Sequence, residues 1–152
     1  AERFGKHRCG IVETDPGGER SSSVHAAEGT AAHQVLTWAL QQNKPAAEFI
    51  GTELAVDGFE FVVDIEMAGH VQTCINYVRD ASMGGGAVMV DLRVNYSQHL
   101  GVPVADGFGT LDVMILRGDE LHVVDFKYGR GVEVDVEDNR QLKLYALGAL
   151  DE

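Results

Sequence analysis

The sequence predicts a mixed α/β fold, organised as a single domain that covers residues 1–152. Three observations predict it: two stretches with apolar residues at helical spacing, one stretch of strict alternation, and a pair of apolar strands around a Gly-Asp turn. A chain of 152 residues fits one ordinary domain. Helices are expected to flank a central sheet, in the order helix, helix, strand, strand, strand, helix.

The first helix is expected from about Ala26 to Leu40, after the run Ser21-Ser22-Ser23, whose hydroxyls suit an N-cap. One stripe of this helix carries Gly29, His33, Leu36 and Leu40, beside Ala32, Val35 and Ala39. We expect that stripe to face the core. A histidine on such a stripe is usually a satisfied core residue, so the pattern alone does not make His33 a ligand.

The second helix is expected to begin near Asp64 and to end near Met83. Its apolar positions recur at amphipathic spacing and are Met67, Val71, Cys74, Ile75 and Val78. The glycines at 84–86 then form a linker, because no phosphate-binding context surrounds them. The preceding segment from Glu53 to Val63, with its apolar and acidic residues, is treated as a connection between the two helices.

The strands follow. Residues 88–94 alternate between apolar and other side chains, which is typical of a strand. After a loop through Pro103 and Gly107, a hairpin runs from Leu111 to Leu116, turns at Gly118-Asp119 and returns from Leu121 to Lys127. The last element, from about Asp138 to Leu150, has a helical apolar pattern.

Composition limits the function classes. The sequence has no apolar run long enough for a membrane span and no apolar signal core, so a soluble, cytoplasmic protein is expected. Cys9 and Cys74 are too few for a disulfide framework or a four-thiolate metal site. The net charge of −12 argues against general coating of nucleic acid, although it does not exclude a local basic groove.

The hairpin brings charged residues together. With Gly118-Asp119 as a two-residue turn, cross-strand partners place Asp112 opposite Asp125, where facing carboxylates repel unless a cation lies between them. Strand alternation then puts Lys127 on the face of Asp125. Carboxylates that bind Mg²⁺ or Mn²⁺ beside a lysine suit phosphodiester hydrolysis. A purely structural alternative stays open, in which Asp125 and Lys127 form a strand-end salt bridge and Asp112 caps a turn.

Four motifs in order strengthen the first interpretation. Residues 28–33 read EGTAAH, residues 109–112 read GTLD, residues 125–129 read DFKYG, and residues 141–145 read QLKLY. Together they resemble the RecB-like branch of the PD-(D/E)xK nuclease superfamily, and most closely the phage and prophage proteins of unknown function within it. The resemblance spans about residues 21–150. It implies a restriction-endonuclease-like core, of which this chain is expected to lack the last strand because it ends after the final helix.

The resemblance also implies roles for individual residues. It makes His33, Asp112, Asp125 and the carbonyl of Phe126 the metal ligands, and Lys127 the catalytic lysine. Gln141 and Tyr145 share one face of the last helix, and the resemblance implies that they orient the lysine or contact DNA.

Two lesser candidates lie at the margin of this set. Glu28 is ~140° around an ideal helix from His33, so the two side chains cannot point the same way. Glu28 is therefore expected to contact the site from its edge or to cap the helix. Arg130 follows Tyr128 in a Gly-rich segment and either lies beside a DNA strand or simply belongs to a loop that leaves a strand.

The function expected from the sequence is a Mg²⁺- or Mn²⁺-dependent DNA nuclease, an exonuclease or DNA-end-processing enzyme of a phage or prophage. Its expected partners are single- or double-stranded DNA ends and phage recombination or replication proteins. One alternative is a nucleic-acid-binding or phage assembly module with the same fold and weak or no turnover. Another is a metal-dependent hydrolase whose substrate is not a nucleic acid.

Overall fold

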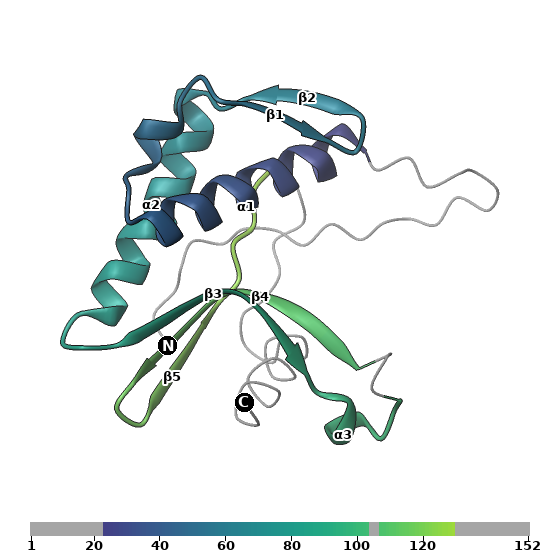
Figure 1. The fold of residues 1–152 in the computed structure, drawn as a ribbon, viewed down its shortest axis with the longest axis vertical. Coiled ribbons are helices and arrows are strands. Elements are labelled where there is room, and N and C mark those ends of the chain that lie inside the picture. Colours follow the sequence, from purple (N-terminus) through teal and green to yellow (C-terminus); the bar gives the residue numbers. More distant parts are fainter. Residues whose placement is uncertain (1–22, 104–106, 130–152) are drawn as a thin grey trace. The chain divides into compact units, whose positions relative to one another are not determined.

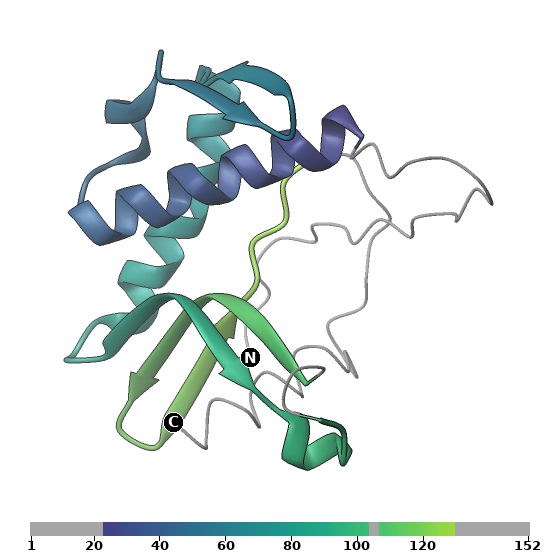
Figure 2. The ribbon, with the colours of Figure 1, turned by 45° about the vertical axis from the view of Figure 1, so that its right-hand side comes forward.

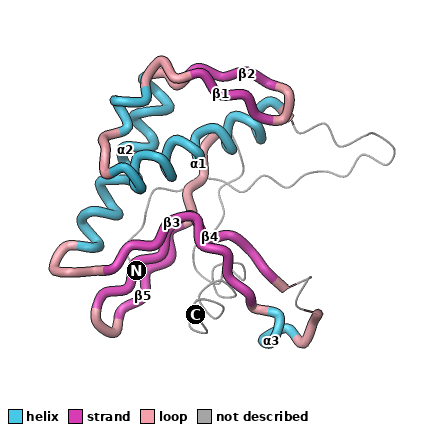
Figure 3. Tube along the Cα trace, in the orientation of Figure 1, coloured by secondary structure: helices cyan, strands magenta, loops and turns pink. Residues whose placement is uncertain are grey.

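The computed structural model describes residues 23–103 and 107–129. These residues belong to two compact units: residues 23–75 and 126–129 form the first, and residues 76–103 and 107–125 form the second. Helices and two small antiparallel sheets confirm the mixed α/β prediction, as Figures 1 and 3 show. The restriction-endonuclease-like core and the single domain stay predictions, and the expected last helix lies outside the described residues.

The first unit is built around helix α1 (Val24–Gln42). The Ser23 side chain accepts a hydrogen bond from the Ala26 amide at 3.3 Å, which caps the helix as the serine run predicts. The helix ends at Asn43, whose left-handed backbone (φ 52) is typical of a C-cap. The predicted stripe is confirmed at its centre, because Ala32, Val35, Leu36 and Ala39 are buried. By contrast, Gly29, His33 and Leu40 lie at its half-buried margin.

A hairpin interrupts the predicted order of elements. After the short 3-10 helix η1 (Ala46–Phe49), strands β1 (Glu53–Val56) and β2 (Phe59–Val62) pair antiparallel, so the interpretation of this segment as a connection was wrong. The turn residues Asp57 and Gly58 both have positive φ, 50 and 82. An Asp-Gly pair between alternating residues is a hairpin signal, and it could have revealed these strands. The hairpin contacts α1, as Figures 1 and 2 show.

Helix α2 (Ile65–Ser82) continues from the first unit into the second. The Asp64 carboxylate accepts a hydrogen bond from the Met67 amide at 2.8 Å and so caps the helix where the sequence predicts. All five apolar positions predicted for its inner face are buried: Met67, Val71, Cys74, Ile75 and Val78. Among the described residues, no helix is long and apolar enough to cross a membrane.

The second unit contains a three-stranded antiparallel sheet with β4 in the middle. Its strands are β3 (Ala87–Asn95), β4 (Phe108–Arg117) and β5 (Glu120–Val124), and the one-turn helix α3 (Ser97–Leu100) follows β3. The predicted turn is confirmed: Arg117 pairs with Glu120 across Gly118-Asp119, and Gly118 has a φ of 61. Strand β5 ends at Val124, however, whereas the sequence predicts a strand to Lys127.

The long strands β3 and β4 bend in the middle, as Figures 1 and 2 show. Asp91 lies at this point of β3 with a φ of 55, a left-handed conformation that is unusual within a strand. One apolar cluster contains Leu111 and Met114, with Met89 and Leu92 packed against it. Met89 and Leu92 are three residues apart, as are Leu111 and Met114, and in a regular strand such residues point to opposite faces. Because all four pack in one cluster, the face of the sheet that points to the cluster changes at the bend.

Candidate functional site

In the first unit, His33 lies against the segment that follows β5. Its ring contacts the Phe126 ring edge to face, with 5.3 Å between the centroids and 63° between the planes. Phe126 is 7% exposed, whereas His33 is half-buried. A buried phenyl ring therefore restricts the orientation of the imidazole. The two residues come from the first and third of the four sequence motifs, 93 positions apart in the chain (126 − 33).

The same segment runs past the N-terminal half of α1. A Cβ atom at Gly29 would lie 3.4 Å from the carbonyl oxygen of Tyr128, and one at Gly129 would lie 3.9 Å from the carbonyl oxygen of His25. The absence of a side chain at Gly29 thus leaves room for the backbone of residues 126–129. The EGTAAH helix and the FKYG part of the third motif are therefore neighbours in space.

Tyr128 lies among carboxylates in this unit. Its ring contacts the His70 ring edge to face, with 5.5 Å between the centroids and 77° between the planes. Burial, as the largest cause, and the negative charges of Glu28, Asp64 and Glu66 together raise the pKa of the Tyr128 hydroxyl from 10.0 to about 12. The hydroxyl is therefore protonated at neutral pH and can donate a hydrogen bond. The charge of Glu28 acts on Tyr128, and the role of Glu28 at the margin of the site stays a prediction.

In the second unit, Asp112 and Asp125 come from neighbouring strands. The partner positions of the β4–β5 ladder follow the predicted register as far as Val113 and Val124, the last pair. Asp112 precedes that pair on β4 and Asp125 follows it after β5 has ended, so both acids lie at the same end of the ladder and both are half-buried. The prediction of directly paired strand residues was wrong, since the ladder ends one position earlier.

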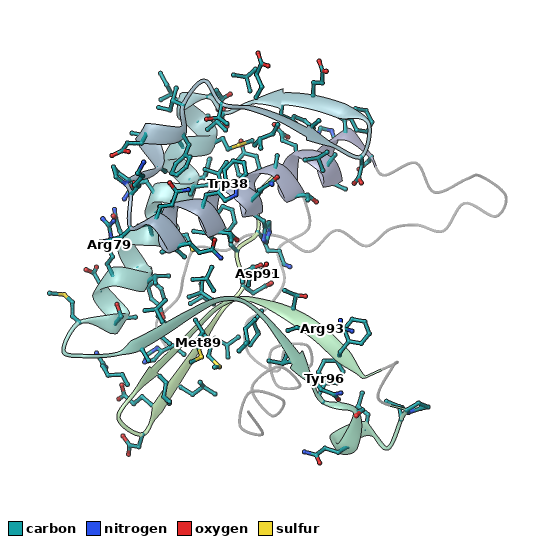
Figure 4. The ribbon with its side chains drawn as sticks, in the orientation of Figure 1. Trp38, Arg79, Met89, Asp91, Arg93 and Tyr96 are labelled. Atoms are coloured by element: carbon teal, nitrogen blue, oxygen red, sulfur yellow. The ribbon has the colours of Figure 1, made fainter. Side chains whose placement is uncertain are left out.

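The left-handed Asp91 was missed by the sequence reasoning. Strand β3 pairs with the edge of β4 that does not pair with β5. Val90 pairs with Val113 and Leu92 with Leu111. Asp91, between these two pairs, therefore lies across from Asp112 but forms no strand pair with it. The signal was present, because Asp91 is the acidic residue within an otherwise apolar stretch from Val88 to Leu92. Figure 4 labels Asp91 near the bend of β3.

Lys127 is half-buried and belongs to the first unit, whereas Asp125 belongs to the second. Residues 125–128 are not in a strand. The strand that the alternation argument requires therefore ends before Asp125, and the placement of Lys127 on the face of Asp125 stays a prediction. Its catalytic role stays a prediction from the motif.

The predicted ligands have suitable chemistry for a hard divalent cation. Carboxylate and carbonyl oxygens bind Mg²⁺ and Mn²⁺, whereas an imidazole nitrogen is a more usual ligand of zinc, copper, iron and nickel. Within residues 23–103 and 107–129, however, no three His, Cys, Asp or Glu side chains gather closely enough to hold a metal ion. The complete ligand set thus stays a prediction. The candidates Arg130, Gln141 and Tyr145 lie outside the described residues.

A family model matches most of the chain. The family model DUF2800, described as a protein of unknown function, matches residues 10–152. This match covers all four sequence motifs. No solved structure matches the chain.

Proposed function

Because the chain belongs to the DUF2800 family, whose function is unknown, we propose from its motifs and packing that it is a divalent-metal-dependent DNA nuclease. The observation that carries this proposal is the contact between His33 and Phe126. The sequence resemblance assigns both residues to one metal site, although they are far apart in the chain. A chance similarity of short motifs would not require the helix with the histidine to pack against the DFKYG segment.

The second support comes from the hairpin. Asp112 lies on β4 and Asp125 directly follows β5, so both acids lie at the same end of the β4–β5 ladder, in the order that the nuclease motif has along the chain. Both are half-buried, and carboxylate oxygens are ligands that Mg²⁺ and Mn²⁺ prefer.

In the proposed site, His33, Asp112, Asp125 and the carbonyl of Phe126 hold Mg²⁺ or Mn²⁺. When bound, such a cation lowers the pKa of water and neutralises charge on the phosphodiester. Lys127 orients the attacking water and stabilises negative charge on the phosphate oxygens. Gln141 and Tyr145 orient Lys127 or contact the DNA strand. DNA, rather than another ester, is proposed on the strength of the four-motif resemblance.

Cleavage assays test this function. Purified protein is incubated with labelled single- and double-stranded DNA in Mn²⁺, in Mg²⁺ and in EDTA, and the products are separated on denaturing gels. We expect metal-dependent cleavage that Asp112→Asn or Asp125→Asn abolishes. Lys127→Ala should lower the rate by roughly 10²- to 10⁴-fold, the usual contribution of a general acid or base.

Two matched controls come from the same regions of the chain. Asp119→Asn removes an exposed carboxylate from the hairpin turn, and Lys44→Ala removes an exposed lysine that pairs with Glu48 at 3.3 Å. Both should leave cleavage unchanged. Cleavage that persists in Asp125→Asn and Lys127→Ala would show that a contaminating nuclease causes it, and the proposal would fail.

A second candidate function is a nucleic-acid-binding or phage assembly module without turnover. The net charge of −12 and the lack of a three-residue metal cluster among the described residues favour it. Metal-independent DNA binding without cleavage in either metal would support this candidate over the nuclease.

A further inference from the structure

An exposed aromatic ring with an arginine stacked on it lies on the second unit. The guanidinium carbon of Arg93, on β3, lies 3.9 Å from the centroid of the Phe108 ring at the start of β4. Phe108 is 42% exposed, so this phenyl ring is not a core residue. In Figure 4, Arg93 lies on the last part of β3, and Tyr96 lies between β3 and α3. We call Arg93, Phe108 and Tyr96 the stacking platform.

The backbone beneath the stacking platform is closely held. The Tyr96 amide donates a hydrogen bond to the Gly107 carbonyl at 2.7 Å, and the Tyr96 hydroxyl donates one to the Phe108 carbonyl at 2.8 Å. A Cβ at Gly107 would lie 2.4 Å from the Cα of Ser97, so only glycine allows this close approach. The Phe108 ring is therefore presented to solvent by a constrained segment, and ordering it on binding costs little entropy.

The segment of sequence that contains the stacking platform is poorer in acidic residues than the whole chain. Between Leu92 and Leu111 the sequence contains one acidic residue, Asp106, although the chain contains 24 and has a net charge of −12. Among the described residues, Arg93 forms no salt bridge, whereas Arg117 is paired with Glu120 at 2.6 Å. The planar guanidinium group of arginine matches the geometry of a phosphate.

We propose that the stacking platform binds single-stranded nucleic acid, with Phe108 stacking on a base and Arg93 pairing with a phosphate. An exposed aromatic ring beside a cation is the combination used for unpaired strands, whose bases are free to stack. Bases within a duplex are already stacked, so the ring favours single strands over double strands. This inference rests on the proposed nuclease function, because that function makes nucleic acid the partner. It adds a surface of the protein that contacts a single strand.

A binding experiment in EDTA separates this inference from catalysis. The probe is a fluorescent oligothymidylate of about 20 nucleotides, longer than the ~4 to 16 nucleotides that a single-strand-binding domain covers. Its affinity is measured by fluorescence anisotropy at several salt concentrations, and a duplex of equal length is measured in parallel. We expect tighter binding to the single strand, and Phe108→Ala should weaken that binding by at least about fivefold.

Further variants distinguish stacking from a general loss of structure. Phe108→Trp keeps an aromatic face and should restore binding. Arg93→Gln should weaken binding and reduce the slope of log affinity against log salt by about 0.7, the value for one phosphate contact on a single strand. The matched control is Arg79→Gln on α2, because Arg79 is also exposed and forms no salt bridge among the described residues. That control should leave both affinity and slope unchanged.

Each other outcome overturns the inference. Equal binding by wild type, Phe108→Ala and Arg93→Gln would remove the stacking platform as a contact, and so would an equal loss in Arg79→Gln. Preference for the duplex, or no binding to either probe, would do the same. The proposed function is judged separately, since cleavage in Mn²⁺ that depends on Asp125 would stand in all of these cases.

Discussion

The contact between His33 and Phe126 predicts a measurable coupling energy. His33→Ala and Phe126→Leu each remove one ring of the edge-to-face pair, whose centroids are 5.3 Å apart. Phe126→Leu is a hydrophobic substitution at a buried position and should cost about 1 kcal/mol. His33→Ala, at a half-buried position, should also cost about 1 kcal/mol.

The double variant should lose less than the sum of these two effects. An aromatic pair contributes about 0.5 to 1.5 kcal/mol beyond the area that it buries. The two single effects sum to about 2 kcal/mol, so the double variant should be destabilised by about 0.5 to 1.5 kcal/mol. The difference is the interaction energy, and it exists only if the two rings touch in solution.

Urea unfolding followed by circular dichroism measures this energy. The titrations are carried out in EDTA, so that a metal on His33 does not contribute, and equal slopes against urea are required before the free energies are compared. His33→Ala combined with Phe59→Leu is the control, because the Phe59 ring contacts Phe61. That control pair should be additive within about 0.5 kcal/mol. Additivity of His33→Ala with Phe126→Leu would refute the contact and remove the main support for the proposed site.

Two further predictions concern stability. Gly107→Ala should destabilise the second unit by about 2 kcal/mol or more, because its Cβ would meet the Ser97 backbone at 2.4 Å. The control is Gly69→Ala, in open space on helix α2, which should stabilise the protein by about 0.5 to 1 kcal/mol. Thermal unfolding compares the two variants, and equal effects would contradict the close approach. For Tyr128, the folded protein holds the phenolic proton more tightly than the unfolded chain, because its pKa is raised from 10.0 to about 12. Its contribution to stability is therefore complete below pH 10 and is lost as the pH rises through 12. Ultraviolet titration of tyrosinate should show a high-pH component that Tyr128→Phe removes, and an unchanged titration curve in that variant would contradict the burial of the hydroxyl among Glu28, Asp64 and Glu66.

Local sequence signals determined the elements that depend on local physics. The serine run and the apolar spacing located α1 and α2, since N-capping and amphipathic periodicity act within a few residues. Gly118-Asp119 determined the β4–β5 register, because a two-residue turn leaves one way to pair the flanking strands. The β1–β2 hairpin carried an equally local signal in Asp57-Gly58, so its omission was an error of interpretation.

For the candidate site, too, some features follow from the sequence alone and others only from the tertiary structure. The sequence by itself determined which residues to consider, because the order of His33, Asp112, Asp125 and Lys127 is written in the motifs. Only the tertiary structure decided that His33 packs against Phe126, that β5 ends before Asp125, and that β3 turns left-handed at Asp91. These features depend on contacts between residues far apart in the chain and on the bend of a sheet. Neither the periodicity nor the composition of a single segment contains that information.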